Sequence, residues 1–131
     1  MFIDASAFCA LLMDEDDAES LSRRLRDAKS RITSSLAIWE TAVAVSKTLG
    51  IRLDIVQKDI EKFLADFRIV VVAIEPDMHE LALDAFRRFG KGRHPAALNF
   101  GDCFAYACAR HHRMPLLFKG NDFALTDIEA A

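Results

Sequence analysis

Four acidic residues lie within apolar segments, where a carboxylate is difficult to explain as part of the solvated surface. They are Asp4 in MFIDASAF, Glu40 in LAIWETAVAV, Asp102 in NFGDCFAYACA and Asp122 in LLFKGNDF. An ionised carboxylate that leaves water must be paired or must bind a metal, because burying it alone is very costly. Oxygen ligands without cysteine or histidine favour a hard cation such as Mg²⁺ or Mn²⁺. The sequence therefore predicts an acidic metal pocket.

A zinc site built from cysteine and histidine is a second interpretation, which the spacing of these residues does not favour. Cys108, His111 and His112 lie close together in sequence, but a zinc site would need another ligand and a different spacing. A buried thiol and two surface imidazoles are the better interpretation. The chain has 3 cysteines, an odd number without a CxxC motif, which predicts reduced thiols in the core rather than a disulfide framework.

A basic segment surrounds one of the four acids. Residues 85–119 contain Asp102 as their single acid, together with these basic residues: Arg87, Arg88, Lys91, Arg93, Arg110, Arg113 and Lys119. Such a segment could bind phosphates beside a metal site. It could equally form solvated helix faces, which is what charge runs usually do. Lys119 could also be a salt-bridge partner of the acids.

Short strands that alternate with helices are expected to position these residues. We predict strands at residues 1–3, 31–33, 68–74 and 116–118, and helices at residues 6–13, 14–29, 34–50, 52–67, 76–89 and 102–112. The β-branched run at residues 70–74 is typical of a parallel strand that is buried on both faces. The alternation predicts an α/β fold with three layers, α/β/α, around a short and mainly parallel sheet.

This fold would bring the four acids together although they are distant in sequence. Ligands of open α/β sheets bind outside the carboxyl ends of the strands. Asp4 directly follows the first strand and Asp122 follows the last, so both should lie along that edge. Asp102 falls in the first turn of its helix, where the helix dipole favours a carboxylate. Glu40 lies inside a helix and is not explained as a cap.

Length and composition indicate one ordinary globular domain over residues 1–131. Hydrophobic residues make up 52% and charged residues 28% of the chain, and the formal net charge is −3. The longest strongly apolar run is too short to cross a bilayer, and Asp4 stands where a signal peptide would be apolar or basic. We therefore expect a cytoplasmic protein that does not enter a membrane.

Four motifs in order make the chain similar to a known family. They are IDASA at residues 3–7, SSLAIWET at 34–41, NFGDCFAYA at 99–107 and LLFKGNDF at 116–123. Together they resemble the PIN-domain ribonucleases, and among these the toxin subunits of bacterial VapBC-type toxin–antitoxin modules. The resemblance spans essentially the whole chain.

The resemblance assigns roles to particular residues. Asp4, Glu40 and Asp102 match the three acids of the family's metal site. Asp122 fits the fourth acid best, although Asn121 stands where some relatives carry an acid and Asp127 follows a few residues later. Ser6 and Asn121 are expected to support the site, Ser6 by a hydrogen bond to Asp4 or to a metal-bound water.

The same resemblance implies an activity and partners. The expected function is the toxin of a type II system, a Mg²⁺-dependent endoribonuclease that a cognate VapB-type antitoxin inhibits, with Mn²⁺ as a second cation. A homodimer is expected, with partner contacts on the helices of residues 34–67. Lys91, Arg93 and Lys119 are the candidate RNA contacts. Trp39 and Tyr106, next to the acids, could stack on a base, but core positions are the preferred interpretation.

Rival functions fit the residues less well. A phosphoacceptor domain needs an adjacent pair of acids near the N-terminus, and a haloacid-dehalogenase-like phosphatase needs a second aspartate after Asp4, where Asp4-Ala5-Ser6 stands. The alternative that stays open is a PIN-like RNA-binding or interaction module without catalysis.

Overall fold

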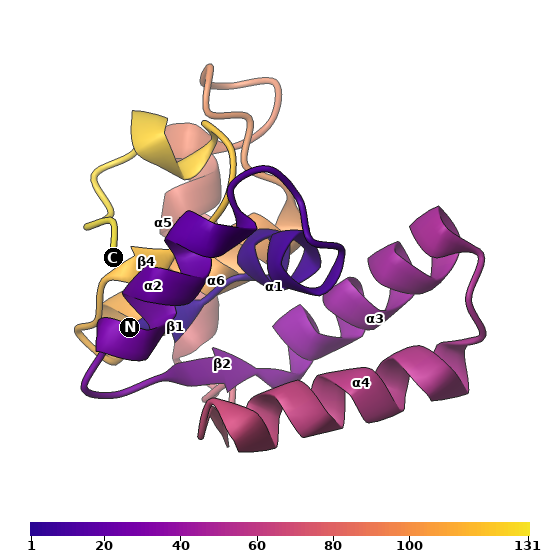
Figure 1. The fold of residues 1–131 in the computed structure, drawn as a ribbon. Helices are drawn as coiled ribbons and strands as arrows, with labels where there is room; N and C mark the ends of the chain where they lie inside the picture. Colours follow the sequence, from indigo (N-terminus) through magenta and orange to yellow (C-terminus); the bar gives the residue numbers. More distant parts are fainter.

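Four short parallel strands form the centre of the molecule. The computed structural model describes residues 1–131. The strands are β1 (Phe2–Ile3), β2 (Ile32–Ser34), β3 (Val70–Val72) and β4 (Leu116–Leu117), and their order in the sheet is β3-β2-β1-β4 (Figure 1). Phe2 lies opposite Ile32 on one side and opposite Leu116 on the other. The first and the last strand of the chain are therefore neighbours in the sheet.

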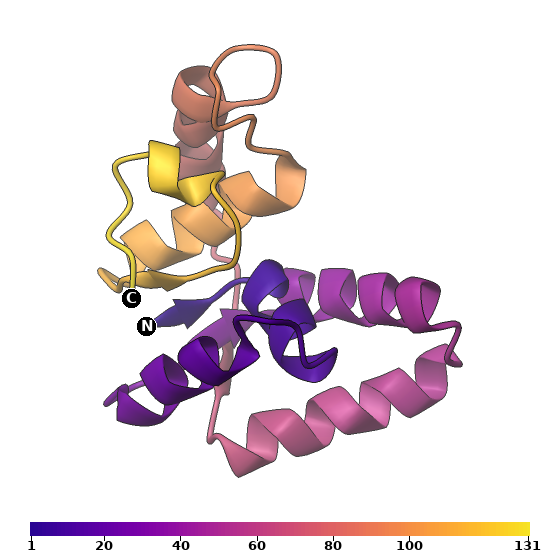
Figure 2. The ribbon, with the colours of Figure 1, turned by 45° about the horizontal axis from the view of Figure 1, so that its top comes forward.

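Helices cover both faces of the sheet and complete the predicted α/β architecture. They are α1 (Ala5–Leu12), α2 (Ala18–Asp27), α3 (Ser35–Leu49), α4 (Leu53–Asp66), α5 (Met78–Phe89) and α6 (Phe100–His111), with a short 3₁₀ helix, η1 (Phe123–Leu125). Figure 2 shows α5, α6 and the C-terminal segment on one side of the strands, with α1 to α4 on the other. No helix combines the length and the apolar content needed to cross a membrane.

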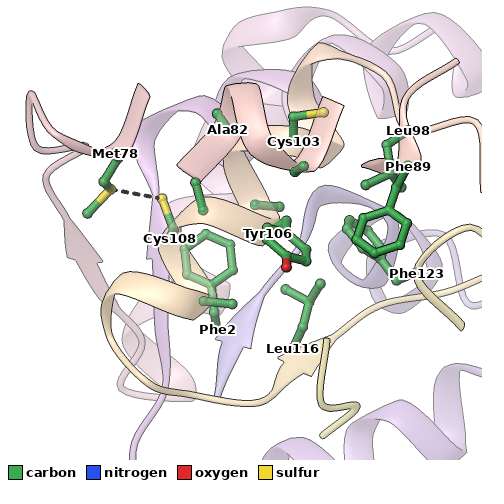
Figure 3. Packing of buried hydrophobic residues seen from close by; sticks show 14 of the residues in the cluster. Phe2, Met78, Ala82, Phe89, Leu98, Cys103, Tyr106, Cys108, Leu116 and Phe123 are labelled. Atoms are coloured by element: carbon green, nitrogen blue, oxygen red, sulfur yellow. Dashed lines mark hydrogen bonds between the residues drawn. The ribbon is translucent and has the colours of Figure 1, made fainter. Parts of the chain in front are cut away.

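Alternation along the strands divides the core into two main parts. Phe2 and Leu116 pack against α5 and α6, where Figure 3 shows them with Met78, Tyr106 and Phe123. The next residue of each strand, Ile3 or Leu117, turns to the opposite face and packs against α1 and α2. This is the period of two that an extended chain imposes on its side chains. All three cysteines are free, and Cys103 and Cys108 are buried, as predicted.

Local signals fix the two helices that carry Glu40 and Asp102. Ser34 caps α3, since its hydroxyl accepts a hydrogen bond of 3.2 Å from the Ala37 N–H. Gly50 ends the same helix in the left-handed conformation, with φ of 65°. Asn99 caps α6, so that helix begins before Gly101 rather than after it as predicted. Gly101 thus lies inside the first turn.

Two predictions about burial are wrong. β3 is an edge strand and pairs with β2 alone, and Val70 and Val71 are 59% and 45% exposed instead of buried on both faces. Trp39 is 63% exposed and does not belong to the core. On α4 the buried residues are Val56 and Ile60, whereas Ile55 is 47% exposed. Tyr106 is buried, as predicted.

Candidate active site

Asp4 is held at the carboxyl end of β1. Its N–H donates to the Leu117 carbonyl over 3.0 Å, and its side chain caps α1 by accepting from the Ser6 N–H. The same carboxylate oxygen accepts from the Ser6 hydroxyl at 2.5 Å, and that hydroxyl in turn accepts from the Lys119 N–H at 3.0 Å. Asp4 is 3% exposed. Burial raises its pKa, an effect that the hydrogen bonds from Ser6 partly oppose.

Glu40 extends from α3 toward the start of α6. Its carboxylate lies against Gly101, the residue that directly precedes Asp102 in the sequence. Burial raises the pKa of Glu40 to about 7, and the negative charges of Asp4 and Asp102 add to this effect. Asp4, Glu40 and Asp102 belong to segments that are distant in sequence, but the negative charges of their carboxylates act on one another.

Asp102 takes part in the cap at the start of α6. Its carboxylate accepts a hydrogen bond of 2.8 Å from the Asn99 N–H, while the Asn99 side chain accepts one of 3.0 Å from the Asp102 N–H. This reciprocal pair is a capping box and fixes the orientation of the Asp102 side chain. Burial raises the pKa of Asp102 to about 6; the bond from Asn99 lowers it, and Asp4 and Asp122 raise it further.

Asp122 completes the group of four predicted acids from the loop after β4. It is exposed, directly precedes η1 and forms no capping hydrogen bond. Its negative charge contributes to the raised pKa of Asp102. The neighbouring Asn121 is exposed as well.

Asp127, the other candidate for the fourth acid, belongs to a separate cluster. It accepts from the Tyr106 hydroxyl at 2.8 Å and pairs with Arg88 at 2.7 Å and Arg110 at 2.8 Å. Burial would raise the pKa of Asp127, but the hydrogen bonds from Arg88, Tyr106 and Arg110 outweigh it and lower the pKa to about 2. The cluster ties the C-terminal segment to α5 and α6.

None of the three basic candidates forms an ion pair with Asp4, Glu40, Asp102 or Asp122. The Lys119 ammonium pairs with Glu15 and, at 3.2 Å, with Asp17 in the segment between α1 and α2. Lys91 and Arg93 lie exposed in the loop between α5 and α6. The Arg93 guanidinium lies over the Phe86 ring, 5.3 Å from its centre.

The donor set of this site fits a hard divalent cation. Asp4, Glu40 and Asp102 take part in none of the ion pairs of the chain, so their mutual repulsion is not neutralised by a protein cation. Asp4, Glu40 and Asp102 do not lie close enough together to form a cluster of three metal ligands. A bound cation would require these side chains to move closer. Cys108, the cysteine of the zinc alternative, is buried, and its thiol lies 3.6 Å from the sulfur of Met78.

Two residues of the site were missed in the sequence. Asn99 orients Asp102, and the signal for it was available, because an asparagine three residues before an acid at a helix start is a capping-box pattern. Gly101 on α6 contacts Glu40 on α3. Nothing in the local sequence around either residue indicates that contact.

Comparison with known proteins agrees with this architecture. The PIN domain family matches residues 1–129. Among solved structures, the VapC20 toxin of Mycobacterium tuberculosis, described as cleaving the sarcin-ricin loop, shares the fold with a TM-score of 0.75 at 20% identity, covering 99% of this chain and 97% of that one. A toxin–antitoxin complex from Klebsiella pneumoniae contains a chain with a TM-score of 0.68 at 17% identity, covering 94% of this chain and 89% of that one.

Sequence similarity extends over the full length of a curated relative. A protein called ribonuclease VapC from Mycolicibacterium smegmatis is 42% identical over 130 residues, which cover 99% of this chain and 98% of the relative. The chain therefore belongs to the PIN-domain family, among the VapC-type ribonucleases.

Proposed function

We propose that this protein is a metal-dependent endoribonuclease and the toxin of a type II toxin–antitoxin system. The observation that carries the proposal is the approach of the Glu40 carboxylate on α3 to the first turn of α6, beside Asp102, with the negative charge of Asp4 also raising the pKa of Glu40. These three residues would hold Mg²⁺ or Mn²⁺, and Asp122, with Asn121 beside it, would orient water at the exposed side. The name of the curated relative supports the choice of RNA as substrate.

The chain's own groups prepare the site for hydrolysis of a phosphodiester bond. Ser6 fixes the carboxylate of Asp4, and Asn99 fixes that of Asp102. A bound divalent cation would activate water and stabilise negative charge on the attacked phosphate. Attack in line with the leaving oxygen would produce a 5′-phosphate and a 3′-hydroxyl, so no side chain has to form a covalent intermediate. Lys91, Arg93 and Lys119 remain candidates for contacts with RNA phosphates.

An apolar groove between α3 and α4 supports docking of an antitoxin. The groove has a volume of about 380 Å³ and is lined by residues that include Ile38, Val43 and Leu64. Trp39 and Leu53, which also line it, are 63% and 52% exposed. Large apolar side chains on a groove suit an amphipathic partner segment. We assign this surface to a VapB-type antitoxin, with a homodimer as the assembly and the cytoplasm as the location that we predict.

The test of catalysis is RNA cleavage by the purified protein, freed from any antitoxin, with Mg²⁺, with Mn²⁺ and with a chelator. Wild-type protein should cleave when a metal is present, and Asp4→Asn should lose cleavage while it keeps the fold. Asp59→Asn, an exposed acid on α4, is the matched control and should cleave normally. RNA binding without metal-dependent cleavage would favour the alternative of a catalytically inactive PIN-like module.

A further inference from the structure

We infer that Gly101 is a positioning residue, because the absence of a side chain there allows the Glu40 carboxylate to lie beside Asp102. The inference rests on the proposed metal site and adds to it a residue that provides space rather than a ligand. It concerns the contact between the middle of α3 and the first turn of α6.

The backbone does not explain a glycine at this position. Gly101 is buried within α6, and it is not among the glycines with positive φ, which are Gly50, Gly92 and Gly120. Glycine inside a helix costs about 1 kcal/mol relative to alanine. A residue that weakens the helix and needs no special conformation is expected to have a reason in its surroundings.

The surroundings of Gly101 supply that reason. A Cβ atom at this position would overlap both carboxylate oxygens of Glu40 and the carbon between them, which are the three atoms nearest to it. By comparison, a Cβ at Gly90 would overlap the backbone oxygen of Phe86, and a Cβ at Gly50 would meet nothing within 4 Å. Gly101 is therefore the glycine whose missing side chain is replaced by an acid of the site.

A methyl group at position 101 should displace the carboxylate rather than disrupt the fold. Glu40 reaches Gly101 with the far end of a side chain that has several rotatable bonds, so it can rotate away at low cost. The carboxylate would then leave the neighbourhood of Asp4 and Asp102. A bound cation would lose a ligand or bind it in poorer geometry, while the helix itself would gain from alanine.

Mn²⁺ binding to the full-length protein, measured by calorimetry without RNA, tests this inference. Gly101→Ala should lower the affinity roughly tenfold or more, the size of effect seen when ligand orientation is lost. Its melting temperature without metal should equal or exceed that of wild type. Gly50→Ala is the matched control and should show the opposite pattern: a lower melting temperature from the positive φ of 65°, and unchanged Mn²⁺ affinity.

A double-mutant cycle identifies Glu40 as the group through which Gly101 acts. In protein that already carries Glu40→Gln, adding Gly101→Ala should cause no comparable further loss of Mn²⁺ affinity, because the ligand to be displaced is gone. Wild-type affinity in Gly101→Ala, loss of its fold, or an equal loss in the Glu40→Gln background would each overturn the inference. Absence of Mn²⁺ binding by wild type would also overturn it. Mn²⁺ binding that depends on Gly101, without RNA cleavage, would support the inference and refute the proposed ribonuclease function.

Discussion

Replacing Glu40 with glutamine should make the metal-free protein more stable at neutral pH. Burial and the charges of Asp4 and Asp102 raise the pKa of Glu40, so the folded state tolerates the neutral form better than the ionised one. Between the ordinary pKa of 4.5 and the folded value of about 7, the folded state binds more protons than the unfolded state. The stability of the wild type is therefore complete below pH 4.5 and falls as the pH rises through 7. Glutamine cannot ionise and avoids this loss.

The size of the effect follows from the change in pKa. A tenfold change in proton affinity corresponds to about 1.4 kcal/mol, so a rise from 4.5 to about 7 corresponds to roughly 3 kcal/mol. The Glu40 side chain is only partly buried, and solvent screening reduces this to about 1.5 kcal/mol. For a chain of 131 residues, that is a rise of about 5 °C in melting temperature at pH 8.

Urea denaturation in a chelator at several pH values between 4 and 8 measures the effect. The stability difference between Glu40→Gln and wild type should be close to zero near pH 4.5 and should grow toward pH 8. Saturating Mn²⁺ should reverse the order, because the cation stabilises the protein that binds it better. Glu61→Gln on α4 is the matched control, since glutamine can still accept the hydrogen bond from Gln57. Parallel pH curves for wild type and Glu40→Gln would refute the electrostatic account of the site.

Four further changes test other parts of the structure. Asp4→Ala should be about 1 kcal/mol less stable than Asp4→Asn by urea denaturation, because alanine cannot cap α1, and equal stability would remove the cap from the account. Asp127→Asn should cost about 1 kcal/mol at pH 7, after allowing for its exposure, and leave RNA cleavage intact. Its contribution is complete above pH 3.8 and is lost as the pH falls through about 2. Asp122→Asn should show the reverse, with impaired cleavage and unchanged stability. If Asp127→Asn loses cleavage and Asp122→Asn does not, Asp127 rather than Asp122 is the fourth acid of the site. Neutralising Lys91 and Arg93 together should reduce the salt dependence of RNA binding by roughly 1.4 log units per tenfold salt, and an unchanged slope would remove both from the RNA path.

Most of the architecture could be predicted because it depends on local signals. Ser34 and Gly50 mark the ends of α3, and alternation at Phe2 and Ile3 follows from an extended chain. The parallel pairing of β1 with β4 agrees with the expectation that Asp4 and Asp122 follow strands ending on the same side of the sheet.

The wrong predictions concern residues whose burial depends on distant partners. The run of valines in β3 is equally compatible with a central and an edge strand, and only the strand order decides between them. Apolar residues occur on more than one side of α3, so the sequence does not show which side is exposed. The exposure of Trp39 depends on where α4 packs against α3. The contact of Gly101 with Glu40 depends on how α3 passes α6, which no local pattern reports.

The pairing of the first strand with the last sets the time at which the acidic pocket can form during synthesis. Asp4 and Glu40 leave the ribosome early, but β1 obtains its second neighbour only when β4 has been made, and the Ser6 hydroxyl that holds Asp4 obtains its donor only with Lys119. Nascent chains that end before residue 102 lack two of the four acids. A ribonuclease built in this order would remain inactive until its translation is almost complete.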